Sequence, residues 1–139
     1  MIEPLIIEPT PMRDIWDCGV ACLVMLTSRS YGEIRAAIPR GTRVQEGLGD
    51  TALRNIARRV GCDTRWIITK DANLEEIMGI LVLVRPMDPS KPKGEMEGHC
   101  VMILKGVLYN PADTHIWTDI ESFLKTRRWR PTRVLVRVD

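Results

Sequence analysis

Hydrophobic positions divide the chain into a helical first half and a strand-rich second half. The nearly continuous apolar run over residues 18–27 predicts a helix that is buried on most sides. The capping-box pattern of Ser30 to Glu33 predicts a second helix, which Pro39 stops. A third helix is expected after Asp50, because apolar residues then recur at i, i+3, i+4 and i+7 until Gly61. This part of the chain therefore predicts a layer of helices.

The second half alternates short apolar runs with turn residues, as is typical of a sheet. Strands are expected over residues 64–69, 80–85, 100–104, 107–109 and 133–138. Two short helices are expected to begin at residues 73–76 and 118–121. Lys105-Gly106 predicts a tight hairpin turn, and the proline-containing segment 86–98 predicts an exposed loop. The predicted fold class is α+β, with N-terminal helices packed on a mostly antiparallel sheet.

Length and composition predict a single globular domain over residues 1–139. Residues 1–15 are expected to form an extended N-terminal arm, since their prolines exclude a helix, and residues 5–7 could add a short strand. Apolar residues make up 45% of the chain, and the net charge of +2 is too small to indicate a polyanionic partner. The longest apolar run, Ile80 to Val84, has the length of a strand, so no membrane span is expected.

The N-terminus and the cysteine pattern bear on where the protein works. No basic segment precedes the first apolar residues, so no signal peptide is expected. The four cysteines are not spaced like a compact disulfide framework. A cytoplasmic protein with reduced thiols is therefore the expectation.

Cys18 is the candidate nucleophile. Asp17 is a good N-cap residue, so Cys18 is expected in the first turn of the buried helix. Unpaired backbone N–H groups and the positive end of the helix dipole favour a thiolate there. The alternative is that Cys18 is a small buried hydrophobic residue, as many free cysteines are. Cys22, one turn further on, is expected in the core.

His99 is the candidate base. It is expected at the start of the first hairpin strand, and Asn110 closes the second strand, so the turn brings the two residues together. An amide or carboxylate beside the imidazole would fix its tautomer, and Asp113 is the alternative orienting group. His115 is expected on the surface. The order Cys, His, Asn follows the logic of papain-like peptidases.

Two other chemistries compete with the nucleophile. Cys18, Cys22, His99 and Cys100 could together ligate zinc, but their spacing is not that of structural zinc sites, so neither a metal nor another cofactor is expected. The stretch from Lys125 to Arg133 surrounds a tryptophan with arginines and could contact nucleic acid. A solvated helix end is the commoner meaning of such a stretch, and the balanced overall charge favours it.

Four segments carry a resemblance to a known family. They are residues 17–23 (DCGVACL), 53–61 (LRNIARRVG), 98–104 (GHCVMIL) and 109–111 (YNP). Together they resemble the bacteriocin-processing (double-glycine leader) cysteine peptidase family over roughly residues 12–115. The resemblance implies a papain-like fold, a peptide or protein substrate, and cleavage after small residues. It implies Cys18 as nucleophile, His99 as base and the residue before Pro111 as orienter.

The chain departs from that family at two positions. Asn110 stands where the family usually has Asp, and papain-like enzymes use Asn in that role. Met12 stands where the family has the glutamine of its oxyanion hole, which leaves the backbone N–H of Cys18 as the donor that the resemblance implies. The prediction is therefore a cysteine peptidase or related thiol acyl-transfer enzyme, and the alternative is a weak or inactive peptide-binding or regulatory module on the same fold.

Overall fold

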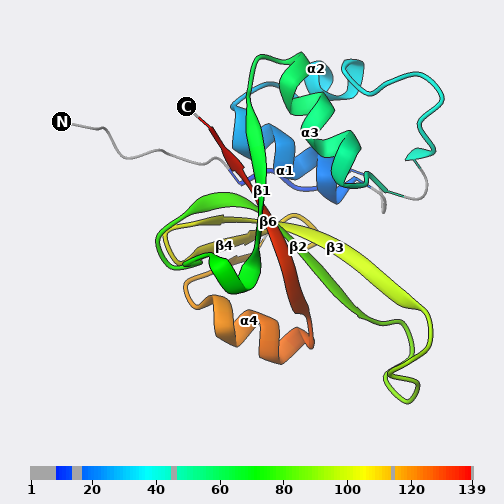
Figure 1. The fold of residues 1–139 in the computed structure, drawn as a ribbon, viewed down its shortest axis with the longest axis vertical. Helices are drawn as coiled ribbons and strands as arrows, with labels where there is room; N and C mark the ends of the chain where they lie inside the picture. Colours follow the sequence, from blue (N-terminus) through cyan, green and yellow to red (C-terminus); the bar gives the residue numbers. More distant parts are fainter. Residues whose placement is uncertain (1–8, 14–16, 45–46, 114, 139) are drawn as a thin grey trace.

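A single antiparallel sheet forms the centre of the molecule (Figure 1). The computed structural model describes residues 9–13, 17–44, 47–113 and 115–138. The sheet has the order β1-β6-β2-β3-β4-β5. Its strands are β1 (Thr64–Ile68), β2 (Met78–Pro86), β3 (Met96–Leu104), β4 (Val107–Asn110), β5 (His115–Trp117) and β6 (Arg130–Arg137). Every strand pair is antiparallel, so the predicted α+β class and its antiparallel sheet are confirmed.

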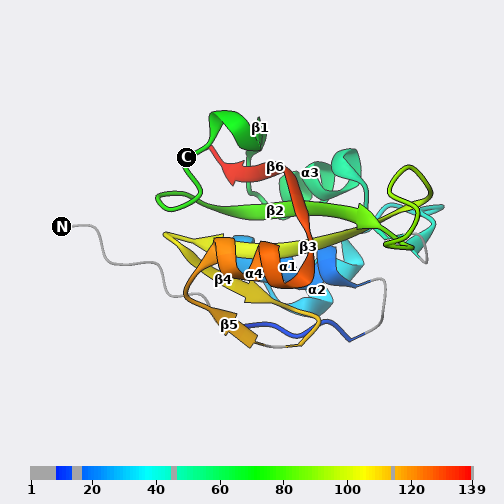
Figure 2. The same cartoon turned by 90° about the horizontal axis from the view of Figure 1, so that it is seen from below.

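Helices cover both faces of this sheet. The N-terminal helices are α1 (Cys18–Thr27), α2 (Tyr31–Ala36) and α3 (Asp50–Arg59), and α4 (Ile120–Arg127) follows β5. Figure 2 shows α4 in front of the sheet and α1 behind it. A short 3-10 helix (Thr69–Asp71) follows β1.

Alternate residues of the central strands build two separate cores. Ile80 and Val82 of β2 point to the α1 face, while Leu81 and Leu83 point to the α4 face. Because β2 is buried on both faces, its sequence is continuously apolar rather than alternating. This explains why a simple period of two is absent there although the segment is a strand.

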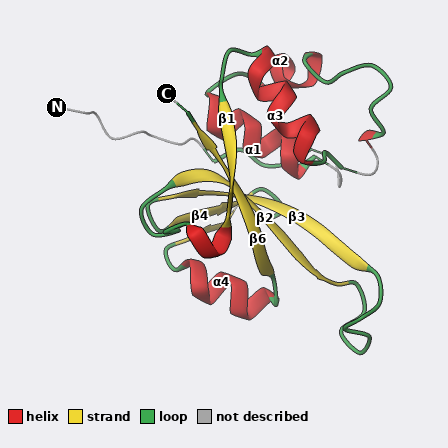
Figure 3. Cartoon of the chain, viewed as in Figure 1, coloured by secondary structure: helices red, strands yellow, loops and turns green. Residues whose placement is uncertain are grey.

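The hairpin of β2 and β3 is longer than the sequence predicts. The strands remain paired out to Pro86 and Met96, and Arg85 forms an ion pair with Glu97 opposite, at 2.5 Å. Cross-strand pairing of charged residues continues the ladder beyond the apolar run. The predicted loop over 86–98 is therefore wrong at both ends, and the arm that it caps extends away from the sheet (Figure 3). His99 is consequently inside β3 and does not open it.

The helix starts show which capping predictions hold. The capping box of Ser30 and Glu33 is confirmed, with both of its hydrogen bonds present. Asp17 occupies the N-cap position of α1, but its side chain makes no capping bond. Gly49, and not Asp50, is the N-cap of α3, since Asp50 is already helical.

The segment after the 3-10 helix is a turn. A helix was predicted to begin at residues 73–76, but the Asn73 side chain accepts the backbone N–H of Glu75 at 3.1 Å, and Glu76 bonds back to the Asn73 carbonyl at 3.0 Å. An Asx-type turn of this kind closes on itself instead of propagating. The strand β5 was also missed, because three residues carry too little pattern to be recognised.

Two predictions concern the ends of the fold. The proposed strand over residues 5–7 lies outside the described residues. Residues 9–13 are described and form neither helix nor strand. Among the described helices, none has the length and apolar character needed to cross a membrane.

Candidate active site

Cys18 begins α1 and is partly buried against the core on the α1 face. Its sulfur interacts with three groups: the thiol of Cys100, the ring of His99 and the backbone N–H of Cys100. The hydrogen bond from the Cys100 thiol contributes most, burial opposes it, and the contacts with His99 and the Cys100 backbone add to it. Together they lower the pKa of Cys18 to about 4. The cysteine is therefore held as a thiolate near neutral pH.

The part of β3 that carries His99 and Cys100 lies at an open edge of the β3–β4 ladder. The ladder between β3 and β4 ends at the pair Met102 and Tyr109, so the backbone of Cys100 has no β4 partner. Both the backbone and the thiol of Cys100 contribute to the lowered pKa of Cys18. Side chains at successive positions point to opposite faces, and a group at the edge can meet both.

His99 is held by the amide of Asn110. The ring nitrogen Nε2 lies 2.7 Å from Asn110 Oδ1, and the backbone N–H of Ala112 donates to the same oxygen at 3.2 Å. Asn110 is only 5% exposed. With Nε2–H bonded to the amide, Nδ1 is the ring nitrogen left to exchange a proton.

The charge state of His99 follows from opposing effects. Burial lowers the pKa of His99, and this is the largest effect. The contacts with Cys18 and Asn110 raise the pKa, and the nearby charge of Arg85 lowers it slightly. The net direction is upward. A raised imidazole pKa beside a lowered thiol pKa favours a thiolate–imidazolium pair.

Trp129 stacks on His99, a contact that the sequence did not reveal. The two ring centroids are 5.5 Å apart with an interplanar angle of 25°. The guanidinium of Arg85 lies 3.9 Å from the centroid of the same indole. Trp129 thus restricts the imidazole plane from one side while Asn110 holds its edge. The only sequence signal was a tryptophan within the basic stretch.

Asp113 and His115 lie away from these contacts. The Asp113 carboxylate accepts the backbone N–H of His115 at 2.8 Å and pairs with Arg127 at 3.2 Å. His115 is exposed on β5, with its ring 5.4 Å from that of Trp117. Of the two orienting groups left open by the sequence, Asn110 is the one whose side chain bonds to the His99 ring.

Met12 runs alongside the end of β4. Its backbone N–H donates to the carbonyl of Pro111 at 3.1 Å, and its half-buried side chain packs against the core that Cys18 also contacts. A thioether has no hydrogen to donate, and the Met12 N–H is already used. Met12 therefore offers no donor to a developing oxyanion.

Asp17 ties the start of α1 to α2. Its carboxylate is fully buried and accepts the hydroxyl of Tyr31, while its second oxygen Oδ1 has no hydrogen-bond partner among the described residues. Burial and this contact raise the pKa of Tyr31, which keeps the phenol protonated as the donor. The guanidinium of Arg13 lies 4.0 Å from the Tyr31 ring centroid. These contacts fix the residue that directly precedes Cys18.

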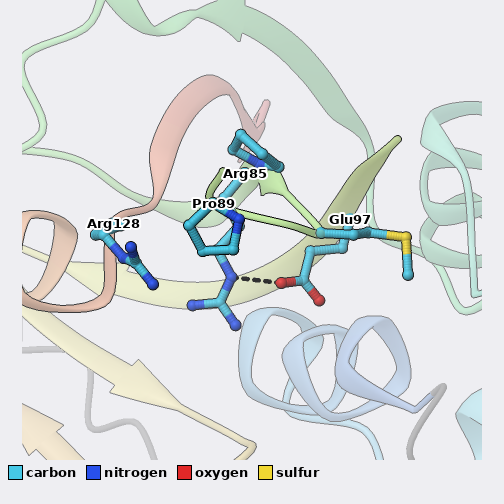
Figure 4. A pocket seen from close by; sticks show the side chains of 6 residues that line it. Arg85, Pro89, Glu97 and Arg128 are labelled. Atoms are coloured by element: carbon cyan, nitrogen blue, oxygen red, sulfur yellow. Dashed lines mark hydrogen bonds and ion pairs between the residues drawn. The ribbon is translucent and has the colours of Figure 1, made fainter. Parts of the chain in front are cut away.

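A pocket of about 410 Å³ lies near the His99 stack. It is lined by Arg85, Pro86, Met87, Pro89, Glu97 and Arg128. Figure 4 shows the ion pair between Arg85 and Glu97 crossing this pocket. Arg85 also contacts the indole of Trp129, which stacks on His99. Only the Trp129 ring therefore separates this wall of the pocket from the imidazole.

Part of the basic stretch is engaged within the molecule. Arg127 pairs with Asp113, Arg133 pairs with Asp50, and Trp129 faces His99. These contacts occupy the tryptophan that would stack a base, while Lys125, Arg128 and Arg130 remain exposed. Within the described part of the chain, no group of three or more His, Cys, Asp or Glu side chains could hold a metal ion.

Comparison with known proteins identifies the fold. No family model matches the sequence, and no curated protein matches it by sequence. A solved structure of a double-glycine motif protease from an AMS/PCAT transporter, in complex with the leader peptide, matches with a TM-score of 0.67. The two sequences are 14% identical, and the match covers 96% of this chain and 91% of that one. The chain therefore has the α+β fold of the papain-like cysteine peptidases.

Proposed function

We propose that this chain is a cysteine peptidase in which Cys18 attacks the carbonyl carbon of a peptide bond. His99 is the general base and acid, Asn110 orients it, and residues 1–139 act as one peptidase domain. The observation that carries the proposal is the continuous chain of contacts from the Cys18 sulfur through the His99 ring to Asn110 Oδ1. A buried cysteine with no chemical role would not need this arrangement.

The reaction follows from the charge states of these groups. The Cys18 thiolate forms a bond to the carbonyl carbon, and the carbonyl oxygen takes the negative charge. The His99 imidazolium then donates its Nδ1 proton to the leaving amine as the C–N bond breaks. Neutral His99 next takes a proton from water, which attacks the thioester and releases the acid. Asn110 keeps Nε2–H occupied throughout, so the reacting nitrogen does not change.

The substrate is proposed to be a peptide cut after small residues. The structural neighbour was solved with a leader peptide, and its name refers to a double-glycine motif. Arg85 and Glu97 line a pocket large enough for a flanking side chain of such a peptide. The protein is proposed to act in the cytoplasm and without a cofactor.

A second function is favoured by Met12. Removing one hydrogen-bond donor from the oxyanion hole of an enzyme lowers kcat by a factor of about 10²–10³. The Met12 side chain has no hydrogen-bond donor. The alternative is therefore a peptide-binding or regulatory module that retains the fold and the thiol but has little turnover.

Turnover of a peptide ester ending in Gly-Gly by wild type, Met12→Gln and Cys18→Ala separates the two functions. A correctly aimed Gln donor would lower the barrier by up to about 2–4 kcal/mol, and less where the aim is imperfect. Acceleration by Met12→Gln that disappears when Cys18→Ala is added supports a peptidase with a weakened oxyanion site.

Two other results have different meanings. If no variant turns over the ester although all remain folded by circular dichroism, the peptidase proposal is wrong and the binding module is favoured. If wild type is already fast and Met12→Gln changes nothing, another group supplies the donor and Met12 is not at the oxyanion position.

A further inference from the structure

The pocket beside the His99 stack carries a positive charge that its own walls do not neutralise. Its charged lining residues are Arg85, Arg128 and Glu97, and its other lining residues are two prolines and a methionine. Glu97 already forms an ion pair with Arg85 at 2.5 Å. The side chain of Arg128 is exposed and forms no hydrogen bond or ion pair within the described part of the chain. One guanidinium therefore lines the pocket without a counter-charge.

The backbone holds Arg128 beside the base of the β2–β3 hairpin. Arg128 is the C-cap residue of α4 and has a left-handed backbone with a φ of 58°. The guanidinium of Arg85 donates to the backbone carbonyl of Arg127 at 2.8 Å, which ties the end of α4 to β2. Glu97 lies directly opposite Arg85 in the β2–β3 ladder. Figure 4 shows Arg128 and Glu97 on opposite sides of Arg85, so the paired and the unpaired charges occupy different parts of the pocket.

We propose that this pocket binds an acidic side chain of the peptide substrate, glutamate rather than aspartate, and that Arg128 is the residue that selects it. The inference rests on the proposed function, because it names one side chain of the peptide that Cys18 is proposed to cleave. The methylene groups of glutamate pack against the prolines and the methionine of the walls. Its carboxylate meets the unpaired guanidinium, whose planar fork binds both carboxylate oxygens at once.

The pocket is close enough to the proposed active site for one peptide to occupy both. The ring centroid of Trp129 lies 3.9 Å from Arg85 Cζ and 5.5 Å from the centroid of the His99 ring. An extended peptide covers about 3.3–3.6 Å per residue, so a residue about two to four positions from the scissile bond reaches the pocket. The volume of about 410 Å³ is sufficient for one such side chain.

Basic and apolar side chains fit the same pocket less well. A lysine would have to draw Glu97 away from Arg85 and would lie beside the unpaired charge of Arg128. An apolar side chain would remove water from the Arg128 guanidinium without replacing its hydrogen bonds, which costs free energy. The charges therefore favour an anion, and the three kinds of side chain give different results in the test.

A set of peptides measured by binding and by turnover tests the inference. Fluorescent peptides containing Gly-Gly carry Glu, Gln, Lys or Leu at each of about four positions on either side of the motif. Binding is measured by anisotropy with Cys18→Ala, and kcat/KM is measured with the wild-type chain. At one position Glu should be preferred over Gln by about five- to tenfold at low ionic strength, and about 0.5 M NaCl should weaken this preference.

Substitutions of Arg128 make the result specific. Arg128→Gln should abolish the preference for Glu, Arg128→Lys should retain part of it, and Arg128→Glu should reverse it to Lys at the same position. Arg58→Gln is the matched control, because it removes an exposed arginine of α3 that does not line the pocket, and it should keep the full preference. Thermal melting checks that every variant is folded.

Three results would overturn the inference: a preference for Glu that persists in Arg128→Gln, a preference for Lys or Leu at the position that Arg128 affects, or no preference at any position. The two measurements also separate this inference from the proposed function. Binding that prefers Glu without any turnover would refute the peptidase function alone. Turnover without a preference for Glu would refute the acidic pocket alone.

Discussion

The thiolate character of Cys18 leads to a quantitative prediction about its alkylation. An ordinary cysteine, with a pKa near 8.5, is less than about 1% thiolate at pH 6. Cys18, with a pKa of about 4, is almost entirely thiolate at the same pH. Its rate of reaction with iodoacetamide should therefore stay constant within about twofold between pH 5 and pH 8, because the thiolate fraction no longer changes. A free small thiol in the same tube should speed up about tenfold per pH unit over most of this range.

The slope with pH, and not the absolute rate, is the diagnostic quantity. Nucleophilicity falls with pKa with a Brønsted coefficient of about 0.4–0.5, so a pKa lowered by about 4–5 units costs roughly a hundredfold per thiolate. At pH 6 this loss nearly cancels the gain in thiolate fraction, and at pH 8 Cys18 should react more slowly than the free thiol. A fast absolute rate would therefore be the wrong criterion.

The assay quantifies modification of each cysteine by mass spectrometry at several pH values. Cys100→Ala and His99→Ala each remove a contact that lowers the Cys18 pKa, so both should move the midpoint upward. Cys62→Ala is the control and should not move it. A Cys18 rate that climbs tenfold per pH unit from pH 5 to pH 8 in wild type would refute the thiolate assignment.

Cys18 and His99 together set the pH range of activity, and each contributes to the stability of the folded state over a different pH range. The folded state lowers the Cys18 pKa, so this contribution is present above the ordinary thiol pKa and is lost as the pH falls through about 4. The folded state raises the His99 pKa, so that contribution is present below about pH 6.5 and is lost as the pH rises through the higher folded value. Peptide turnover should be bell-shaped between the two, with both limbs belonging to the coupled pair.

Three further predictions concern the support of the site and the sheet. Asn110→Ala should lower kcat by at least about tenfold, because the substitution removes the hydrogen bond that orients the imidazole of His99. KM should stay nearly unchanged, since Asn110 is not proposed to contact the substrate, and parallel measurements of kcat and KM check both expectations. Tyr31→Phe should lower the free energy of unfolding by about 1–3 kcal/mol in a urea titration, because it deprives a buried carboxylate of its donor. Tyr109→Phe, whose hydroxyl bonds to none of the described residues, should change it by no more than about 0.5 kcal/mol. Gly79→Ala should lower the free energy of unfolding by about 1–3 kcal/mol, since the new Cβ would lie 2.5 Å from a β6 carbonyl oxygen. Gly32→Ala, where no atom lies within 4 Å of the new Cβ, should raise the free energy of unfolding by about 0.5–1 kcal/mol. Equal destabilisation by the two substitutions in a urea titration would contradict the packing argument.

Features encoded by neighbouring residues were predictable from the sequence. The buried helix at 18–27 was expected from its apolar run, and the structure has α1 over the same residues. The Lys105-Gly106 turn was expected between two strands, and both of its residues have positive φ, as a two-residue hairpin turn of type I′ requires. In each case the information lies within a few positions of the chain.

The groups that surround the site were less predictable because they meet across the fold. Trp129, which directly precedes β6, reaches His99, and Arg85 reaches the same indole from β2. No spacing in the sequence signals these contacts. The influence of Cys100 on the pKa of Cys18 was also missed, because alternation along a strand predicts opposite faces for His99 and Cys100.

Pro111 is the residue that links the sheet to the chemistry. It follows Asn110, the last residue of β4, and it has no N–H with which to continue the ladder. Pairing therefore stops, and the edge of β3 at Cys100 remains open. The Pro111 carbonyl in turn holds the arm at Met12. Ending β4 at Asn110 thus places the amide at the His99 ring, and the carbonyl of the residue that ends the strand positions the arm at Met12.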